Sequence, residues 1–380
     1  MNALCSGARR ILFLSVSAGA GHMRAAEALK EATLLLAPDA KAMHLDVMDY
    51  VPSTFRKIYT DYYIKLVTKH PALWGMLYQA SSEAQPDAVS QKLRRAVERL
   101  STRPLRGAID EFAPDAIVCT HFLPAELLMR EIGKGRVDVP VFVQITDFDL
   151  HRMWVIPRMS GFFAGNEEVA FRLRAHGIEA DHIHVTGIPI MPAFAQNHDR
   201  AACAAAFGLD PAKRTYLLMG GGAGLGVGPV AKRLIAADPE LQLVVLAGKN
   251  KKTLEELEAL AASQPGRLFP LGFTNEVPRL MAAADLVITK PGGLSTSECL
   301  AMGVPMLLSS PIPGQEERNA DYLMENGAAM KAIDEIGLEY HVALLKAEPG
   351  RLETMRRQAG TLGRPEAGRD AMRIVLEALA

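Results

Sequence analysis

A single histidine stands where an apolar run gives way to a helical pattern. The stretch "SVSAGAGHMRAAEAL" (15–29) resembles the end of a buried strand, a glycine turn and a helix start, with His22 at the bend. An imidazole with an unperturbed pKa of about 6.5 can act as a general base near neutral pH. The helix dipole favours its neutral, proton-accepting form. His22 is therefore a candidate base, and a histidine that only caps or solvates the turn is the alternative.

A glycine-rich loop follows a strand-like run in the second half of the chain. The stretch "LLMGGGAGLGVGP" (217–229) holds five glycines between positions 220 and 226. Such a loop lets main-chain amides approach a phosphate, and the next helix adds its positive end. Neither GxGxxG nor GxxxxGK[ST] is complete, which disfavours a dinucleotide-dependent dehydrogenase and a P-loop enzyme. The glycines exceed the needs of a turn, so we favour a phosphate site over a ligand-free βα turn.

Polar residues gather after two later strand-like runs, within "ADLVITKPGGLSTSECLAMGVPMLLSSPIPGQEERNADYL" (284–323). One strand is expected to end at Lys290, and a Pro-Gly-Gly loop should lead into a helix that starts near Ser295. Ser295 and Glu298 have the S-x-x-E spacing of a capping box. The second polar group stands at the next helix start and consists of Gln315, Glu316 and Asn319. Taken alone, each group is explained equally well by helix capping.

The elements that must position these residues alternate along the whole chain. Short apolar runs, each followed by a helical pattern, predict an α/β fold with parallel sheets covered by helices. The strands are expected at 10–16, 116–121, 140–147, 161–165, 215–220, 241–248, 285–290 and 305–310.

The strand–helix pattern restarts near residue 214, which predicts two doubly wound domains facing a cleft that gathers ligands at the strand ends. We place the domains at 1–195 and 196–350. A C-terminal helical segment at 351–380 could pack on either domain, and the N-terminal one is our choice.

Composition excludes several classes of protein. The 380 residues carry a net charge of −1, which gives no polycation for nucleic acid. The four cysteines form no CxxC pair, which argues against a zinc site or a disulfide framework and favours a reducing cytoplasm. No run reaches the roughly 18 apolar residues of a spanning helix. The run "ILFLSVSAGA" could be a signal peptide, but its continuity with the helix pattern favours a buried strand.

Together these motifs resemble a known family. The segment "TKPGGLSTSECLAMGVPMLL…PGQEERNADYL" is similar to the donor half of GT-B glycosyltransferases, a group that includes the peptidoglycan N-acetylglucosaminyltransferase. "SVSAGAGHMRAAEAL", "ITDFDLHRMWVIPRMSGFFAGNEEV" and "HVTGIPI" resemble the monogalactosyldiacylglycerol synthases and processive diacylglycerol glucosyltransferases. The resemblance covers residues 10–330. It implies a GT-B fold of two Rossmann-like domains and an inverting transfer of glucose or galactose from a UDP-hexose to diacylglycerol.

The resemblance also implies roles for individual residues. His22 and Asp147 become the catalytic candidates, with Asp147 orienting an imidazole or taking part in proton transfer. Glu298 would bind the uridine ribose, and Phe273, in "PLGFTNEV", would lie near the uracil. The remaining donor-binding candidates are Gly221, Gly222, Gly224, Gly293, Ser295, Thr296, Gln315 and Glu316, and the acceptor-binding candidates are Gly21, His151 and Trp154.

Asp147, Phe148 and Asp149 also form a D-x-D pattern typical of metal sites. We predict no metal and no cofactor, because metal-bridged diphosphates belong to a different glycosyltransferase architecture. In the GT-B architecture, main-chain amides and helix ends stabilise the leaving diphosphate.

The stretch "FRKIYTDYYIKLVTKH" (55–70) sets Tyr59, Tyr62 and Tyr63 along one helical stripe, and a basic stretch follows at 92–106. Alone, this pattern is typical of an amphipathic core helix. The resemblance favours a cytoplasmic enzyme held peripherally at an anionic membrane surface. The alternatives are transfer of N-acetylglucosamine to a polyprenyl-linked acceptor, a UDP-sugar epimerase, and a non-catalytic UDP-sugar-binding partner.

Overall fold

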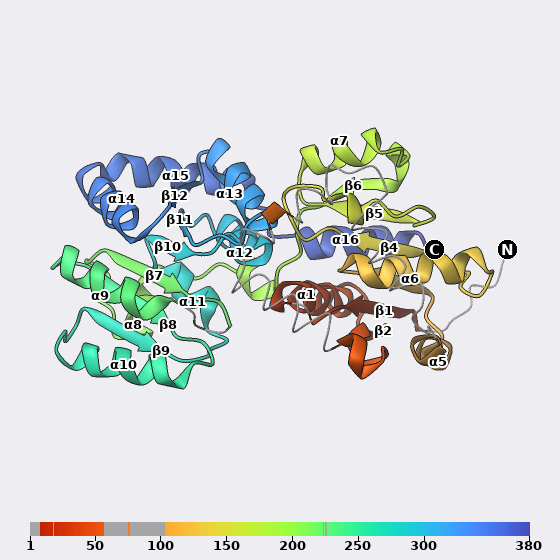
Figure 1. The fold of residues 1–380 in the computed structure, drawn as a ribbon, viewed down its shortest axis with the longest axis horizontal. Coiled ribbons are helices and arrows are strands. Elements are labelled where there is room, and N and C mark those ends of the chain that lie inside the picture. Colours follow the sequence, from red (N-terminus) through yellow and green to blue (C-terminus); the bar gives the residue numbers. More distant parts are fainter. Residues whose placement is uncertain (1–7, 18, 57–74, 77–102, 223, 225) are drawn as a thin grey trace. The chain divides into compact units, whose positions relative to one another are not determined.

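The computed structural model describes the chain at residues 8–17, 19–56, 75–76, 103–222, 224 and 226–380. The chain forms two compact units. Unit 1 comprises Met1–Pro192, Pro313–Gln315 and Glu366–Ala380, and unit 2 comprises Ala193–Ile312 and Glu316–Pro365. Each unit is built around one parallel sheet (Figure 1). The tyrosine stripe expected at 59–67 and most of the basic stretch at 92–106 lie outside the described residues.

The sheet of unit 1 has six strands in the order β2-β1-β3-β4-β5-β6, all parallel. Its described elements are β1 (Arg10–Ser15), α1 (Ala20–Leu36), β2 (Lys41–Asp46), η1 (Val47–Asp49), α5 (Arg103–Phe112), β3 (Ala116–Cys119), α6 (Phe122–Gly133), β4 (Val141–Gln144), η2 (Arg152–Trp154), β5 (Gly161–Ala164), α7 (Glu167–Ala175), η3 (Ala180–His182), β6 (Ile183–Val185) and α16 (Ala367–Glu377).

The sheet of unit 2 also has six parallel strands, in the order β12-β11-β10-β7-β8-β9. Its elements are η4 (Pro192–Ala195), α8 (Arg200–Ala206), β7 (Thr215–Met219), α9 (Val227–Ala237), β8 (Gln242–Leu246), α10 (Lys251–Ala262), β9 (Leu268–Leu271), α11 (Val277–Ala283), β10 (Leu286–Thr289), α12 (Gly293–Ala301), β11 (Met306–Ser309), α13 (Gln315–Glu325), β12 (Ala329–Ala332), α14 (Glu335–Ala347) and α15 (Pro349–Leu362). The predicted α/β class with parallel sheets is confirmed.

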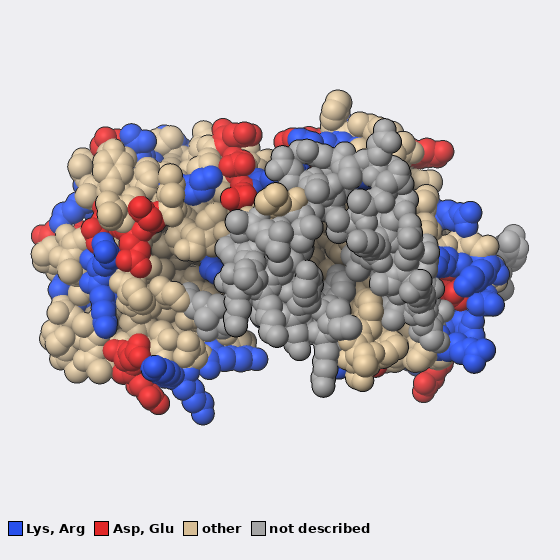
Figure 2. All heavy atoms as spheres, viewed as in Figure 1, with Lys and Arg blue, Asp and Glu red and all other residues tan. Residues whose placement is uncertain are grey.

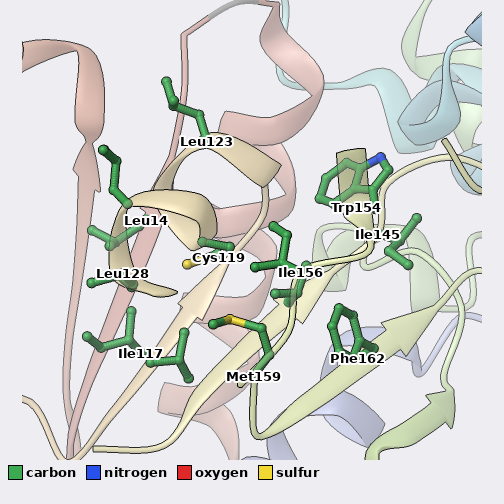
Figure 3. Packing of buried hydrophobic residues seen from close by; sticks show 14 of the residues in the cluster. Leu14, Ile117, Cys119, Leu123, Leu128, Ile145, Trp154, Ile156, Met159 and Phe162 are labelled. Atoms are coloured by element: carbon green, nitrogen blue, oxygen red, sulfur yellow. The ribbon is translucent and has the colours of Figure 1, made fainter. Parts of the chain in front are cut away.

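Both faces of the unit 1 sheet are buried, as parallel sheets require. Alternate residues of β1 serve the two faces: Leu12 and Leu14 belong to one core cluster, Ile11 and Phe13 to the other. Figure 3 shows the first cluster, where Leu14 lies near Leu123 of α6 and Trp154 lies beside Ile145. This packing fixes the carboxyl ends of β1, β3 and β4, where the candidate base is found.

The C-terminal helix α16 packs against α1. A Cβ atom added at Gly368 would lie 3.4 Å from the Cβ atom of Ala32, so the small residues let the two helices approach closely. Ala26 and Leu29 of α1 share a core cluster with Met372 and Val375 of α16. The last segment of the chain therefore braces the helix whose first turn carries His22.

Candidate active site

His22 lies in the first turn of α1. The strand β1 ends at Ser15, and Gly19 precedes the helix with φ 118°, a conformation that glycine adopts without strain. The helix begins at Ala20, so Gly21 and His22 are its second and third residues. The predicted strand–turn–helix is present, with the histidine inside the helix rather than on the preceding turn.

The imidazole of His22 is held by two residues from neighbouring strand ends. Its Nδ1 lies 2.9 Å from the carbonyl oxygen of Thr120 and 3.1 Å from Oγ1 of Thr146. A carbonyl oxygen only accepts hydrogen bonds, so Nδ1 carries the proton of the neutral ring and Nε2 keeps its lone pair. The Thr120 hydroxyl in turn donates to the main-chain carbonyl of His22 at 2.8 Å. The ring is therefore oriented with its basic nitrogen opposite the Thr120 carbonyl.

Aromatic rings surround this imidazole. The ring of His121 contacts it edge-on, with 4.5 Å between centroids, and the Trp154 ring lies at 6.2 Å. Burial lowers the pKa of His22 to about 4, against a smaller raising effect of the bond to the Thr120 main chain. The predicted neutral form is supported, but the expected titration near neutral pH is wrong because burial penalises the charged ring.

A second hydrogen-bond chain fixes the first turns of α1. The Oγ of Ser15 lies 2.6 Å from Nε2 of His44 and donates to the sulfur of Met23 at 2.8 Å. Nδ1 of His44 lies 2.6 Å from a carboxylate oxygen of Glu27, and Nζ of Lys30 donates to the other at 3.1 Å. Burial raises the pKa of the Glu27 carboxyl, but these two partners together lower it below its usual value. Through Met23 and Glu27, the chain ties the part of α1 that follows His22 to β1 and β2.

The other predicted residues of unit 1 follow β4. Nδ1 of His151 accepts from the main-chain N–H of Met153 at 3.2 Å and caps η2, and the Trp154 side chain is buried. Asp147 is partly buried, and its main-chain oxygen lies against Gly165. The structure therefore brings Trp154 to His22, and Thr120 and Thr146 contact Nδ1 of the His22 ring.

Three residues of this site went unnoticed in the sequence: Thr120, His121 and Thr146. Each directly follows the apolar run of a strand, Thr120 and His121 after β3 and Thr146 just after β4. That position is a usable signal, because the carboxyl ends of parallel strands meet at one edge of the sheet.

In unit 2, part of the glycine loop is explained by packing. A Cβ atom at Gly224, where φ is +58°, would lie 1.8 Å from the main-chain oxygen of Ala247. The N–H of Gly224 donates to the carbonyl of Gly221 at 3.0 Å. Gly221 and Gly222 are exposed, and a Cβ atom on either would meet open space. Gly224 therefore shapes the loop, and Gly221 and Gly222 present its outer surface.

The turn after β10 differs from the expectation. The helix α12 begins at Gly293, its N-cap is Gly292, and no side chain caps it. The predicted capping box of Ser295 and Glu298 is therefore wrong, as is the helix start near Ser295, because the Pro-Gly-Gly segment lets the helix begin two residues earlier. The Thr296 hydroxyl donates to the Gly292 carbonyl at 2.9 Å. The uncapped N–H groups of this first turn can bind an anion.

Two acidic residues lie near this turn. Glu298 is 8% exposed inside α12, and burial together with the Glu298 charge raises the pKa of the Cys299 thiol. A carboxylate oxygen of Glu316 accepts from the N–H of Ile312 at 2.6 Å. Burial raises the pKa of the Glu316 carboxyl, against the smaller effects of that bond and of Lys290. Nδ2 of Asn319 donates to the Pro291 carbonyl at 3.1 Å, which ties the start of α13 to the same turn.

Phe273 supplies an exposed aromatic face at the carboxyl end of β9. Its side chain is 61% exposed, and the Nζ atom of Lys249 lies 5.4 Å from the ring centroid. Lys249 follows β8, and its N–H donates to the Gly222 carbonyl at 3.1 Å. The aromatic face and the exposed end of the glycine loop are thus linked through one residue.

Two family profiles match separate parts of the chain. The profile for monogalactosyldiacylglycerol (MGDG) synthase matches residues 22–190, and the profile for glycosyl transferases group 1 matches residues 229–361. The processive diacylglycerol beta-glucosyltransferase of Bacillus licheniformis is 30% identical over 267 residues, which cover 70% of this chain and 69% of that protein. The chain belongs to the family of MGDG synthases and processive diacylglycerol glucosyltransferases.

Other members of the family align over nearly the whole chain. The processive diacylglycerol beta-glucosyltransferase of Bacillus subtilis is 28% identical over 92% of this chain and 90% of its own length. Monogalactosyldiacylglycerol synthase 1 of Arabidopsis thaliana is 29% identical over 94% of this chain and 69% of its own length.

Solved structures of more distant proteins share the fold. MurG of Acinetobacter baumannii has a TM-score of 0.61 at 15% identity, over 97% of this chain and 99% of its own. The UDP-GlcNAc 2-epimerase of Neisseria meningitidis has a TM-score of 0.62 at 14% identity, over 97% of this chain and 100% of its own. These likenesses establish the predicted GT-B fold for a member of this glycosyltransferase family.

Proposed function

We propose that the protein transfers a hexose, glucose or galactose, from a UDP-hexose to the free hydroxyl of diacylglycerol with inversion at the anomeric carbon. The observation that carries the proposal is the match to diacylglycerol glucosyltransferases over most of the chain. The site adds chemical support, because one imidazole is held neutral with its basic nitrogen directed away from its anchor.

In the proposed reaction, the hydroxyl of the acceptor donates its proton to Nε2 of His22 while its oxygen attacks the anomeric carbon. A new C–O bond forms, and the bond from that carbon to the diphosphate breaks. UDP leaves with the electron pair from the opposite face of the sugar, which inverts the configuration. Positioned general bases of this kind contribute roughly 10²–10⁴-fold to rate. Asp147 and His151 remain proposed as its neighbours on the acceptor side.

Unit 2 supplies groups suited to the leaving nucleotide. The exposed Gly221 and Gly222 and the uncapped first turn of α12, with Gly293 and Ser295, offer main-chain N–H groups to the diphosphate. Thr296 is proposed to lie beside them, with its own N–H donating to the Gly292 carbonyl at 3.1 Å. The Glu298 carboxylate would accept hydrogen bonds from the ribose hydroxyls, and the exposed ring of Phe273 would stack on the uracil. Gln315 and Glu316 are proposed to contact the hexose. A carboxylate oxygen of Glu316 would accept a hydrogen bond from a sugar hydroxyl.

The test is incubation of the protein with diacylglycerol vesicles and UDP-glucose, UDP-galactose or UDP-N-acetylglucosamine, with mass spectrometry of the lipids. The proposal predicts a lipid heavier by one or more hexoses with one of the first two donors. Transfer from UDP-N-acetylglucosamine to a polyprenyl-linked acceptor, or release of a free epimer without lipid, would contradict it.

Peripheral attachment to an anionic membrane is part of the proposal, because the acceptor of the related enzymes is a lipid. Among the described helices, none combines the length and apolar character needed to cross a bilayer. Lys and Arg side chains gather at the end of unit 1 near α5 (Figure 2), where Arg106, Lys134 and Arg136 lie within 3.7 Å of Glu131. Sedimentation with anionic and neutral vesicles tests the attachment.

A further inference from the structure

A second imidazole lies directly beside the candidate base. His121 follows Thr120 at the end of β3 and is the N-cap of α6, and its side chain is 3% exposed. Its Nδ1 accepts from the main-chain N–H of Leu123 at 3.0 Å. A main-chain N–H only donates, so Nδ1 of His121 has the lone pair and Nε2 carries the proton. Among the described residues, the hydrogen bonds of His121 involve Nδ1 alone.

The two imidazoles therefore have opposite hydrogen-bonding character. Nε2 of His22 is an acceptor, because its Nδ1–H donates to the Thr120 carbonyl, and Nε2 of His121 is a donor. Both Nδ1 atoms are directed at the main chain of residues 120–123, which leaves both Nε2 atoms on the sides of the rings away from it. The rings are in contact, 4.5 Å apart and nearly perpendicular at 83°.

Burial keeps both imidazoles neutral. Neutral rings are required if Nε2 of His22 is to accept a hydrogen bond while Nε2 of His121 donates one. The pKa of His121 is lowered well below its usual value, first by burial and then by repulsion from a charge on His22. The ring of Phe122 lies 4.1 Å from that of His121, and Trp154 lies 6.2 Å from both imidazoles. Each histidine thus occupies an apolar ring cluster in which its tautomer is set by one main-chain partner.

We propose that His121 is a substrate-binding residue for the acceptor, whose Nε2–H donates to the same hydroxyl oxygen whose proton His22 accepts. A hydroxyl is both donor and acceptor, so it satisfies the two nitrogens at once, whereas a carboxylate can only accept. The surrounding aromatic rings suit an alcohol attached to an apolar molecule. This inference rests on the proposed function and assigns the acceptor hydroxyl to a pair of histidines instead of one.

The test compares three substitutions. His121→Asn keeps a cap for the Leu123 N–H, since asparagine is a strong N-cap, but removes the distant N–H. His121→Gln keeps a distant N–H donor at the end of a longer side chain. His176→Asn, on the exposed end of α7, is the matched control. Acceptor KM and kcat, the UDP dissociation constant and the melting temperature are measured for each variant.

We expect His121→Asn to lower kcat/KM for the acceptor about tenfold, the effect of one lost hydrogen bond, with unchanged UDP affinity. The melting temperature should fall because the smaller side chain loses packing against the neighbouring rings. His121→Gln should recover part of the loss, and His176→Asn should behave as the wild type. Wild-type kcat/KM for the acceptor in His121→Asn would overturn the inference. If His121→Asn fails to fold, His121→Gln decides: a severalfold lower kcat/KM for the acceptor at unchanged UDP affinity supports the donor role, and wild-type kcat/KM for the acceptor contradicts it. Absence of hexose transfer by the wild type would instead contradict the proposed function.

Discussion

Thr120 holds His22 at two points: its carbonyl oxygen lies 2.9 Å from Nδ1 of the ring, and its hydroxyl donates to the His22 main-chain carbonyl at 2.8 Å. The first contact selects the tautomer, and the second fixes the helix turn from which the ring projects. Since Thr120 follows β3 and His22 follows β1, which pair in parallel, the orientation of the ring depends on the register of those two strands.

Replacing Thr120 by valine removes the hydroxyl and keeps the carbonyl. We expect a loss of about 1 kcal/mol in the free energy of unfolding, and a severalfold drop in kcat because the helix turn is less firmly held. Thr33→Val is the matched control: its buried hydroxyl donates to the Leu29 carbonyl at 2.8 Å in the same helix. Chemical denaturation and steady-state kinetics measure both. Equal kcat losses in the two variants would contradict a specific role of Thr120.

The pH dependence of activity reports the pKa of His22. Burial lowers this pKa from 6.5 to about 4, so the ring stays neutral through the weakly acidic range. Above pH 6.5 the ring is neutral in both the folded and the unfolded chain, so protonation of His22 does not reduce the free energy of unfolding. The free energy of unfolding declines as the pH falls from 6.5 toward 4, because His22 of the unfolded chain binds a proton at a higher pH than His22 of the folded protein. We expect kcat/KM to stay level until near pH 4–5. A fall in kcat/KM that is centred near pH 6.5 would contradict this expectation and would show that the imidazole is exposed.

Glu298 is expected to bind the uridine ribose. Its replacement by alanine should weaken UDP binding roughly 10- to 100-fold, the effect of losing hydrogen bonds to a charged group. Isothermal titration calorimetry with UDP measures this. Glu258→Ala, an exposed position on α10, is the control and should leave the affinity unchanged. Wild-type affinity in Glu298→Ala would exclude the ribose role.

Gly224 is expected to be irreplaceable for packing. Alanine there would suffer the strain of φ +58°, about 1–2 kcal/mol, and a clash with the Ala247 carbonyl that adds about 1–3 kcal/mol. Gly177→Ala separates the two costs, because φ is +86° there and the Cβ would meet open space. Urea denaturation of the two variants compares them. A Gly224→Ala protein no less stable than Gly177→Ala would contradict the packing role.

The strands that the sequence pattern did not predict all lie at the edges of the sheets. All eight predicted strands are present. In the part of the chain that the structure describes, the four further strands, β2, β6, β9 and β12, are the edges of the two sheets. Central strands are buried along most or all of their length, whereas β2 and β6 contain no fully buried residue. An edge strand is covered by one neighbour only, so its sequence lacks the continuous apolar run that marks a central strand.

Only the part of the candidate site that is encoded by a local sequence pattern could be predicted. His22 can be found from the sequence alone, because the strand, the glycines and the helix that surround it are contiguous. Its partner Thr120 lies 98 residues away, and nothing local in the sequence reports that β3 pairs with β1. The false capping box at Ser295 has the opposite origin, because a local motif matched while the Pro-Gly-Gly segment started the helix earlier.

The most direct test of the account is the turnover of His22→Ala with diacylglycerol and the preferred UDP-hexose, measured beside UDP affinity and melting temperature. We predict that turnover falls roughly 10²–10⁴-fold while UDP binds as in the wild type. Turnover within a fewfold of the wild type, in a folded protein that still binds UDP, would show that another group accepts the proton.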